Sequence, residues 1–271
     1  MGAGCSSSLV DLGQLDRLAR GQSPIHRLDP RAKLLSALAF AVLVVSVDKY
    51  ALGDLLAFFV FPIFLLVRSN IPPGFVIKRL LAVAPFAVMV GAFNPFFDQE
   101  IVLQIGGFGI TGGWVSFFSI LVRVLLTVGV LILLAATTGI PALGQGAEKL
   151  GVPGIFVAQL LGLYRYLFLL AEETARVTRA YRLRAAGRKT PSWRVFSAIV
   201  GQLLLRALER AQRVYQAMRL RGFDGDIRRL SSMTFTRKDG LFLFGWVGVF
   251  LVLRFFQPAE LLGQVALELG R

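Results

Sequence analysis

Residues 114–136, WVSFFSILVRVLLTVGVLILLAA, decide the class of this chain. Arg123 is the one charged residue in the stretch. As a helix it would extend about 34 Å, and about 20 apolar residues are enough to cross a bilayer. Further blocks almost free of charge occupy residues 34–47, 51–67, 80–97, 155–171 and 241–256. The sequence therefore predicts an all-α fold: a polytopic helical membrane protein with about five or six membrane segments.

The overall composition agrees with this class. Hydrophobic residues make up 55% of the chain and charged residues 17%, whereas soluble domains are nearer 25% charged. The shorter apolar blocks can cross a membrane only with help from flanking residues or a locally thin bilayer. Residues 104–113, QIGGFGITGG, are too rich in glycine for a helix interior and are interpreted as a loop or short hairpin.

Positive charge is concentrated in one segment. The net charge is +14, and residues 176–238 hold 16 Lys or Arg against three acids, Glu209, Asp224 and Asp226. The positive-inside rule places such a segment in the cytoplasm. Nucleic-acid binding is disfavoured because the aromatic residues lie in the membrane blocks rather than among the arginines. The single cysteine, Cys5, excludes an internal disulfide.

The number of crossings is left open by the sequence. Arg31 and Lys33 favour a cytoplasmic N-terminus, yet five full crossings before Arg176 would place the basic segment outside. Either one early block fails to cross, or the N-terminus lies outside. Residues 34–47 form the weakest span, at about 21 Å of helix. Arg123 also has two interpretations: it packs against protein inside the membrane, or it lies at the edge of a segment and reaches the interface.

Two helix ends in the basic segment carry similar arginine motifs. The predicted helices run from about 154 to 184 and from 192 to 221, and they end in Leu183-Arg184-Ala185 and Leu220-Arg221-Gly222. Cations near a helix C-terminus meet the negative end of the helix dipole. Gly222 is suited to the left-handed conformation that ends a helix. Well-capped helices with solvated arginines would explain either end alone, but the recurrence favours a docking function.

The segment around the second motif carries a family resemblance. ERAQRVYQAMRLRGFDG, residues 209–225, resembles the signature of the T component of energy-coupling-factor (ECF) transporters, most closely the cobalt-transport CbiQ branch. SPIHRLDPRAKLL (23–35), TTGIPALGQGAEKLGVP (137–153) and LYRYLFLLAEE (163–173) resemble other parts of that family. The resemblance covers residues 23–255, and the RVYQAM–RG core is its specific part.

The resemblance implies that the two motifs contact ATP-binding subunits. In the family an Ala-Arg-Gly or Ala-Arg-Ser motif at the end of each coupling helix touches one ATPase. Leu replaces the Ala in both motifs here, and Ala185 replaces the Gly or Ser in the first. The register of the first motif could therefore shift toward Ala186-Gly187, with Arg182 or Arg188 making the contact. The residues expected to support the second motif are Arg213, Tyr215, Met218, Arg219 and Phe223.

The implied organisation has four parts. Residues 1–23 are a loose N-terminal segment, 24–171 a transmembrane domain, 172–238 a cytoplasmic coupling domain with two long coupling helices, and 239–271 a C-terminal membrane helix and tail. The implied partners are two CbiO-like ATPases, a CbiM-like substrate-binding membrane subunit and a small accessory CbiN-like subunit. The expected location is the cell (inner) membrane.

The residues predict no chemistry within this chain. Cobalt would require a cluster of imidazole, carboxylate or thiolate ligands, but the chain has one His, His26, and one Cys. No phosphate-binding G-x-x-x-x-G-K-[ST] motif occurs, so ATP would be hydrolysed by partner subunits. The expected function is therefore the coupling subunit of an ATP-driven cobalt transporter that serves cobalamin biosynthesis, with no enzyme activity, cofactor or metal site. The alternatives are a T component for nickel or a vitamin, a self-contained membrane carrier, and an anchor that binds anionic lipid.

Overall fold

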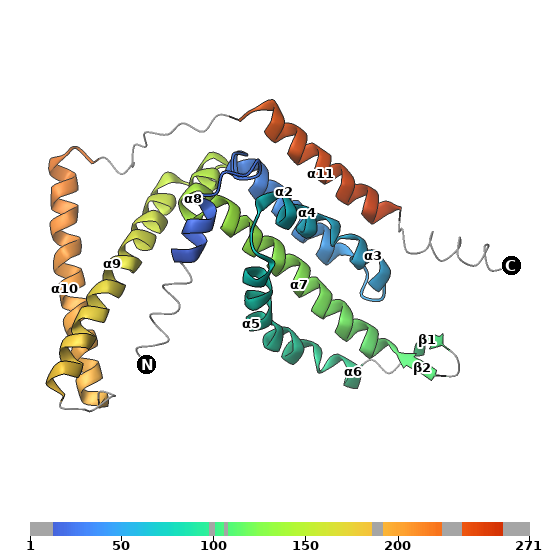
Figure 1. Ribbon diagram of the computed structural model, residues 1–271, viewed down its shortest axis with the longest axis horizontal. Coiled ribbons are helices and arrows are strands. Elements are labelled where there is room, and N and C mark those ends of the chain that lie inside the picture. Colours follow the sequence, from blue (N-terminus) through green and yellow to red (C-terminus); the bar gives the residue numbers. More distant parts are fainter. Residues whose placement is uncertain (1–12, 98–100, 106–107, 186–191, 224–234, 257–271) are drawn as a thin grey trace. The chain divides into compact units, whose positions relative to one another are not determined.

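The computed structural model describes residues 13–97, 101–105, 108–185, 192–223 and 235–256 (Figure 1). The chain divides into two compact units. We name Leu18–Gly139 with Met233–Arg271 the apolar unit, and Met1–Arg17 with Ile140–Ser232 the basic unit. The functional domain boundaries expected from the sequence, at 23/24, 171/172 and 238/239, stay a prediction.

The apolar unit is a helical bundle with one short hairpin. Its helices are α2 (Pro30–Ser46), α3 (Leu52–Ala57), α4 (Val60–Ser69), α5 (Pro73–Gly91), α6 (Asn94–Phe97), α7 (Gly112–Thr138) and α11 (Arg237–Phe255). Strands β1 (Ile101–Ile105) and β2 (Phe108–Thr111) pair antiparallel in the glycine-rich segment, where the sequence predicts a loop or hairpin. The longest helix, α7, packs against α2, α3, α4 and α5. The predicted helical membrane fold is confirmed.

An aromatic cluster forms the centre of the apolar unit. Phe40 of α2 lies 5.2 Å from Phe61 of α4 and 5.3 Å from Phe250 of α11, measured between ring centroids. The ring of Trp246 of α11 lies 4.8 Å from that of Phe61, at a tilted angle. All three phenylalanines are fully buried. Edge-to-face and tilted ring contacts at these separations stabilise a core beyond simple area burial.

The outer surface of the bundle is apolar. Leu38, Val42, Leu81 and Phe86 are among many large aliphatic and aromatic side chains that remain exposed. A water-soluble protein rarely presents such continuous apolar surface, but lipid covers it without cost. In the described part of the chain, four helical stretches are long and apolar enough to cross a membrane: Leu52–Ser69, Pro73–Gly91, Gly112–Thr138 and Gly154–Arg184. The chain is therefore a membrane protein.

Three helix ends meet in one polar group, which we call the anchor cluster; all its members except the exposed Thr236 are buried. Asp29 and Lys33 lie at the start of α2, and Thr137 and Thr138 lie at the end of α7. Thr236 and Asp239 lie at the start of α11. The Lys33 ammonium donates to the Thr137 carbonyl at 3.2 Å and to the Thr138 hydroxyl at 3.4 Å. One Asp239 oxygen accepts from the backbone N–H of Asp29 at 2.9 Å, and the other from that of Thr236 at 2.8 Å.

Two arginines close the opposite end of α2. The last carbonyls of a helix have no partner within the helix. Arg123 of α7 donates to the carbonyls of Val45 and Val47, and Arg254 of α11 donates to that of Ser46 at 3.0 Å. Arg123 is thus a packing partner within protein, which answers the question that the sequence leaves open. Together with the anchor cluster, these contacts make α2 antiparallel to α7 and parallel to α11.

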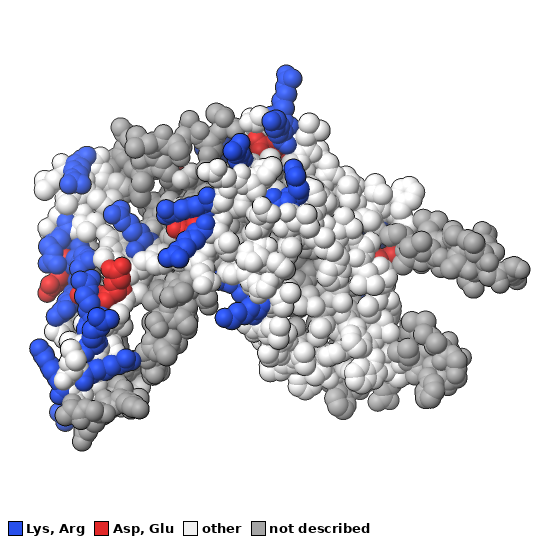
Figure 2. All heavy atoms as spheres, in the orientation of Figure 1, with Lys and Arg blue, Asp and Glu red and all other residues white. Residues whose placement is uncertain are grey.

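Between residues 140 and 223, the described part of the basic unit holds three helices. They are α8 (Ile140–Lys149), α9 (Gly154–Arg184) and α10 (Trp193–Leu220). The ranges of α9 and α10 agree with those expected from the sequence to within one residue. Gly151, at φ +110°, ends the turn after α8, because its N–H and that of Val152 bond back to Glu148 and Ala147. Lys and Arg side chains gather over α9 and α10, whereas uncharged atoms dominate the apolar unit (Figure 2).

Candidate functional site

The second arginine motif sits on a tightly closed helix end. Gly222 adopts φ +80°, and its N–H bonds to the Arg219 carbonyl at 3.0 Å. The N–H of Phe223 bonds to the Met218 carbonyl at 3.1 Å. This pair of bonds is the Schellman arrangement, and it requires the left-handed backbone that glycine adopts freely. The expectation for Gly222 is met, and Arg221 is held at the last position before the turn.

The first motif ends α9 in a different way. Arg184 is the last helical residue, and the N–H of Ala185 bonds to the Tyr181 carbonyl at 2.9 Å. Arg182 and Arg184 are both exposed on the final turn. Ala186, Gly187 and Arg188, which define the alternative register, lie outside the described residues. The register of this motif therefore stays a prediction.

Each motif presents a leucine to solvent beside its arginine. Leu183 is 82% exposed and Leu220 90% exposed, the two highest values among the exposed large apolar side chains of the described chain. Burying a leucine is worth about 1.5–3 kcal/mol, so two bare leucines at helix ends are typical of surfaces that dock. We name the Leu-Arg pairs 183–184 and 220–221 the two tips.

The two tips lie at opposite ends of an antiparallel helix pair. Residues 185–192 join α9 to α10, so the first tip is next to the start of α10 while the second is at its end. α10 has 28 residues, which separates the tips by about 40 Å. Glu173 of α9 binds Arg206 and Arg210 of α10, at 3.5 and 3.6 Å, and holds the helices together. Such spacing suits two separate binding sites on partners.

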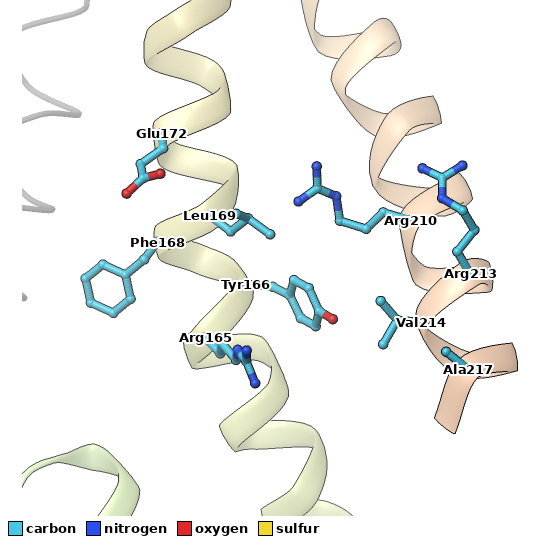
Figure 3. Close-up of a pocket in the computed structure, with 9 residues that line it drawn as sticks. All are labelled: Arg165, Tyr166, Phe168, Leu169, Glu172, Arg210, Arg213, Val214 and Ala217. Atoms are coloured by element: carbon cyan, nitrogen blue, oxygen red, sulfur yellow. The ribbon is translucent and has the colours of Figure 1, made fainter. Parts of the chain in front are cut away.

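A groove of about 680 Å³ opens between α9 and α10. Figure 3 shows Leu169 and Tyr166 pointing from α9 toward α10, and Arg210 reaching from α10 toward α9. Arg165 and Arg213 add two more cations to the lining, and Glu172 one acid. The groove thus combines an apolar floor with a mainly basic rim.

The predicted supporting residues surround the second tip. Arg213 pairs with Glu209 at 3.7 Å, one helical turn before it. The guanidinium of Arg219 lies 6.0 Å from the centre of the Tyr215 ring, within the range of a cation–π contact. Met218 and Phe223 form the capping bond described above. These contacts lie along the last three turns of α10 and at its cap, while the role of each residue in partner binding stays a prediction.

The sequence does not predict the anchor cluster. Two local signals point to it: Asp29-Pro30 has the form of a helix N-cap followed by proline, and Thr236 with Asp239 forms a capping box. Neither signal shows that the two helix starts touch each other, since that contact joins residues 210 positions apart. Lys33 reads in sequence as a cytoplasmic charge, yet it is 3% exposed.

His26 is held by the chain itself. Its Nε2 lies 2.9 Å from the Leu18 carbonyl and Nδ1 2.6 Å from the Ser23 hydroxyl. A carbonyl only accepts, so Nε2 carries the proton, and Nδ1 of the neutral ring accepts from Ser23. Burial lowers the pKa of His26, which favours that neutral ring. Gly21 packs against it so closely that an added Cβ would lie 2.8 Å from the imidazole. In the described residues, no three His, Cys, Asp or Glu side chains form a group that could hold a metal.

A family model and known proteins match the sequence of this chain over most of its length. The family model CbiQ, described as cobalt transport protein, matches residues 21–233. The energy-coupling factor transporter transmembrane protein EcfT of Thermosediminibacter oceani is 29% identical over 77% of this chain and 83% of its own. EcfT of Bacillus subtilis is 26% identical over 85% of this chain and 93% of its own. The cobalt transport protein CbiQ of Rhodobacter capsulatus is 28% identical over 82% of this chain and 89% of its own. The family model covers more than half of the chain, which also has a helical membrane bundle and a basic helix pair. The chain therefore belongs to the CbiQ family and is a transmembrane T component of the ECF-transporter type.

Proposed function

We propose that this chain couples ATP hydrolysis in two separate ATPase subunits to a substrate-binding membrane subunit. The observation that carries the proposal is the pair of exposed Leu-Arg tips about 40 Å apart on one helix pair. Each tip presents an arginine beside an exposed leucine side chain. The planar guanidinium of arginine suits bidentate binding to carboxylates. A CbiO-like ATPase with an acidic groove and a small apolar pocket would fit each tip. This chain itself supplies no catalysis.

The basic unit is proposed to lie on the cytoplasmic side. In the anchor cluster the end of α7 and the start of α11 share one edge of the apolar unit, so residues 139–236 leave and return on one side. That segment must contain an even number of crossings. α9 is apolar enough to cross, but α8 has 10 residues and α10 carries charges such as Arg206, Glu209 and Arg210, so neither could bring the chain back.

It follows that α9 stays outside the bilayer core. In its place, the apolar stretches of α2 and α11 complete the set of spans together with α3–α4, α5 and α7. This assignment removes the conflict in the sequence-based crossings: the extra segment is 155–171, not the weak span 34–47. Arg27, Arg31 and Lys33 lie on the same edge as the two connections, and the positive-inside rule makes that edge cytoplasmic.

Cobalt is the proposed substrate, held by a CbiM-like subunit with a CbiN-like accessory subunit. The match to the cobalt transport protein family supports this choice over nickel or a vitamin. A coupling subunit does not itself hold the ion. Its tips and helix pair therefore concern the binding of the ATPases and not the identity of the substrate. A link to cobalamin biosynthesis follows only if the substrate is cobalt.

The test is to replace the tip arginines. Arg184→Ala and Arg221→Ala, alone and together, should lower ATPase co-purification and ATP-driven Co²⁺ uptake, and the double variant at least tenfold, because each tip loses a charge-assisted contact. Arg176→Ala with Arg194→Ala is the matched control, since both side chains are exposed arginines on the same helices. Wild-type assembly and uptake in the double tip variant would contradict the proposal. Uptake by the purified chain without ATPases would favour a self-contained carrier.

A further inference from the structure

Of the three covalent connections between the two units, the one after Gly139 and the one after Ser232 lie beside the anchor cluster, and the third joins Arg17 to Leu18. Thr138 is two residues ahead of Ile140, the first residue of α8, and Thr236 caps α11 shortly after the basic unit ends at Ser232. The cluster joins these points to each other through Lys33 and Asp239. Movement of the basic unit that reaches the bundle through either of these two connections passes this group.

The charged members of the cluster are buried. Lys33, Asp239 and Asp29 are between 3% and 6% exposed. Lys33 donates to the end of α7, where Thr137 and Thr138 present acceptors that α7 itself leaves free. Asp239 accepts N–H groups from two different segments. Lys33 and Asp239 thus each bond to a second helix end, whereas one carboxylate oxygen of Asp29 has no hydrogen-bond partner among the described residues.

A hinge lies directly beside the cluster. Gly139 is the single residue between α7 and α8, and it adopts φ +76°. Glycine accepts that conformation freely, so the direction of α8 can change there at little cost. Lys33 holds the end of α7 through the Thr137 carbonyl and the Thr138 hydroxyl. The end of α7 is thereby joined to α2, and Gly139 separates it from α8.

We infer that Lys33, Asp29 and Asp239 are positioning residues that fix the helix ends about which the basic unit pivots during coupling. The inference rests on the proposed function. Without the cluster, rotation of α8 would fray the end of α7 instead of moving the bundle. ATP would then be hydrolysed with less substrate transported.

The experiment uses the complete transporter in proteoliposomes. Lys33→Met removes the ammonium, Asp239→Asn keeps one acceptor, Asp239→Ala removes both, and Thr138→Val removes one hydroxyl. The expected result is unchanged ATPase co-purification but less Co²⁺ taken up per ATP hydrolysed, at least tenfold less for Lys33→Met and Asp239→Ala, with Asp239→Asn between them and wild type. Thr127→Val is the matched control, because the Thr127 hydroxyl donates only within α7.

A second measurement does not depend on the substrate. Amide hydrogen exchange in the ATP-bound complex should rise at least tenfold at residues 134–139 in Lys33→Met, and stay unchanged in Thr127→Val. Wild-type uptake per ATP together with wild-type exchange would overturn the inference and leave the proposed function standing. Loss of ATPase co-purification in the cluster variants would also overturn it, by showing a general structural role. If the wild-type chain fails to bind ATPases, the proposed function itself fails.

Discussion

At the scale of single residues, Lys33 is the most unusual group in the apolar unit. Its ammonium lies ahead of the apolar stretch of α2, in the anchor cluster. Burial lowers the pKa of Lys33 to about 8, although the nearby carboxylates of Asp239 and Asp29 act in the opposite direction. The fold thus keeps a buried cation, and burying this charge costs folding free energy. In return, Lys33 fixes the positions of the helix ends that it joins.

This pKa makes stability depend on pH in a known direction. Unfolded Lys33 titrates near 10.5 and folded Lys33 near 8, so between these values the folded state binds fewer protons. The free energy of unfolding should therefore rise as pH increases from 8 to 10.5, on the order of 3 kcal/mol, and the gain is absent below pH 8. Thermal unfolding at a series of pH values checks this.

Comparison with two variants isolates the contribution of Lys33 to that profile. Lys33→Met should flatten the rise, whereas Lys78→Met, at an exposed lysine on α5, should keep it. Groups common to the three proteins cancel in the differences. Identical pH profiles for wild type and Lys33→Met would contradict the burial of a charged Lys33.

At the scale of elements, α10 depends on others for its stability. None of its residues is buried in the described structure, although Leu204, Leu205 and Leu208 lie along it. Isolated helices are marginal in water, and most helical stability comes from packing. The ion pairs from Glu173 are its firmest link to α9. Glu173 is 15% exposed at its side chain, while Arg206 and Arg210 are about half exposed.

Removing the charge of Glu173 should loosen this helix pair. Glu173→Gln should cost about 1 kcal/mol in the local opening of α10, because one acid serves two arginines and water screens both pairs. The control Glu209→Gln affects an exposed pair within α10 and should cost less. Amide hydrogen exchange along α10 measures both. Equal exchange in the two variants would mean that Glu173 does not hold the helices together.

Local patterns allow the elements to be predicted, but not their junctions. The 154–184 and 192–221 helices follow from apolar spacing and from Gly222 as a terminator, and the structure places both there. The contacts of Arg123 with Val45 and Val47, and of Asp239 with Asp29, join residues far apart in sequence. Local pattern carries no information about such partners. The tips could be predicted because each is a single helix end, whereas the anchor cluster needs three.

At the scale of the whole molecule, the arrangement of helices in the membrane decides how motion can pass. Composition alone makes α9 a candidate span, since its first half is apolar. The shared edge of the α7 end and the α11 start supports the opposite assignment, with α8, α9 and α10 on one side. A coupling pair must reach its motors from the cytoplasm, so the side on which α9 lies is a direct test of the proposed function.

Cysteine labelling resolves the position of α9. In a Cys5→Ser background, which removes the chain's single cysteine, Val152→Cys and Leu183→Cys place thiols just before α9 and near its end. Both positions are exposed. If α9 stays on the cytoplasmic side, a membrane-impermeant maleimide should label both in inside-out vesicles and neither in right-side-out vesicles. A span of 31 residues would instead place the two thiols on opposite faces, because it is longer than the bilayer core is thick. Labelling of one position in each vesicle type would therefore show that α9 crosses, and the helix pair could not then act as a cytoplasmic lever.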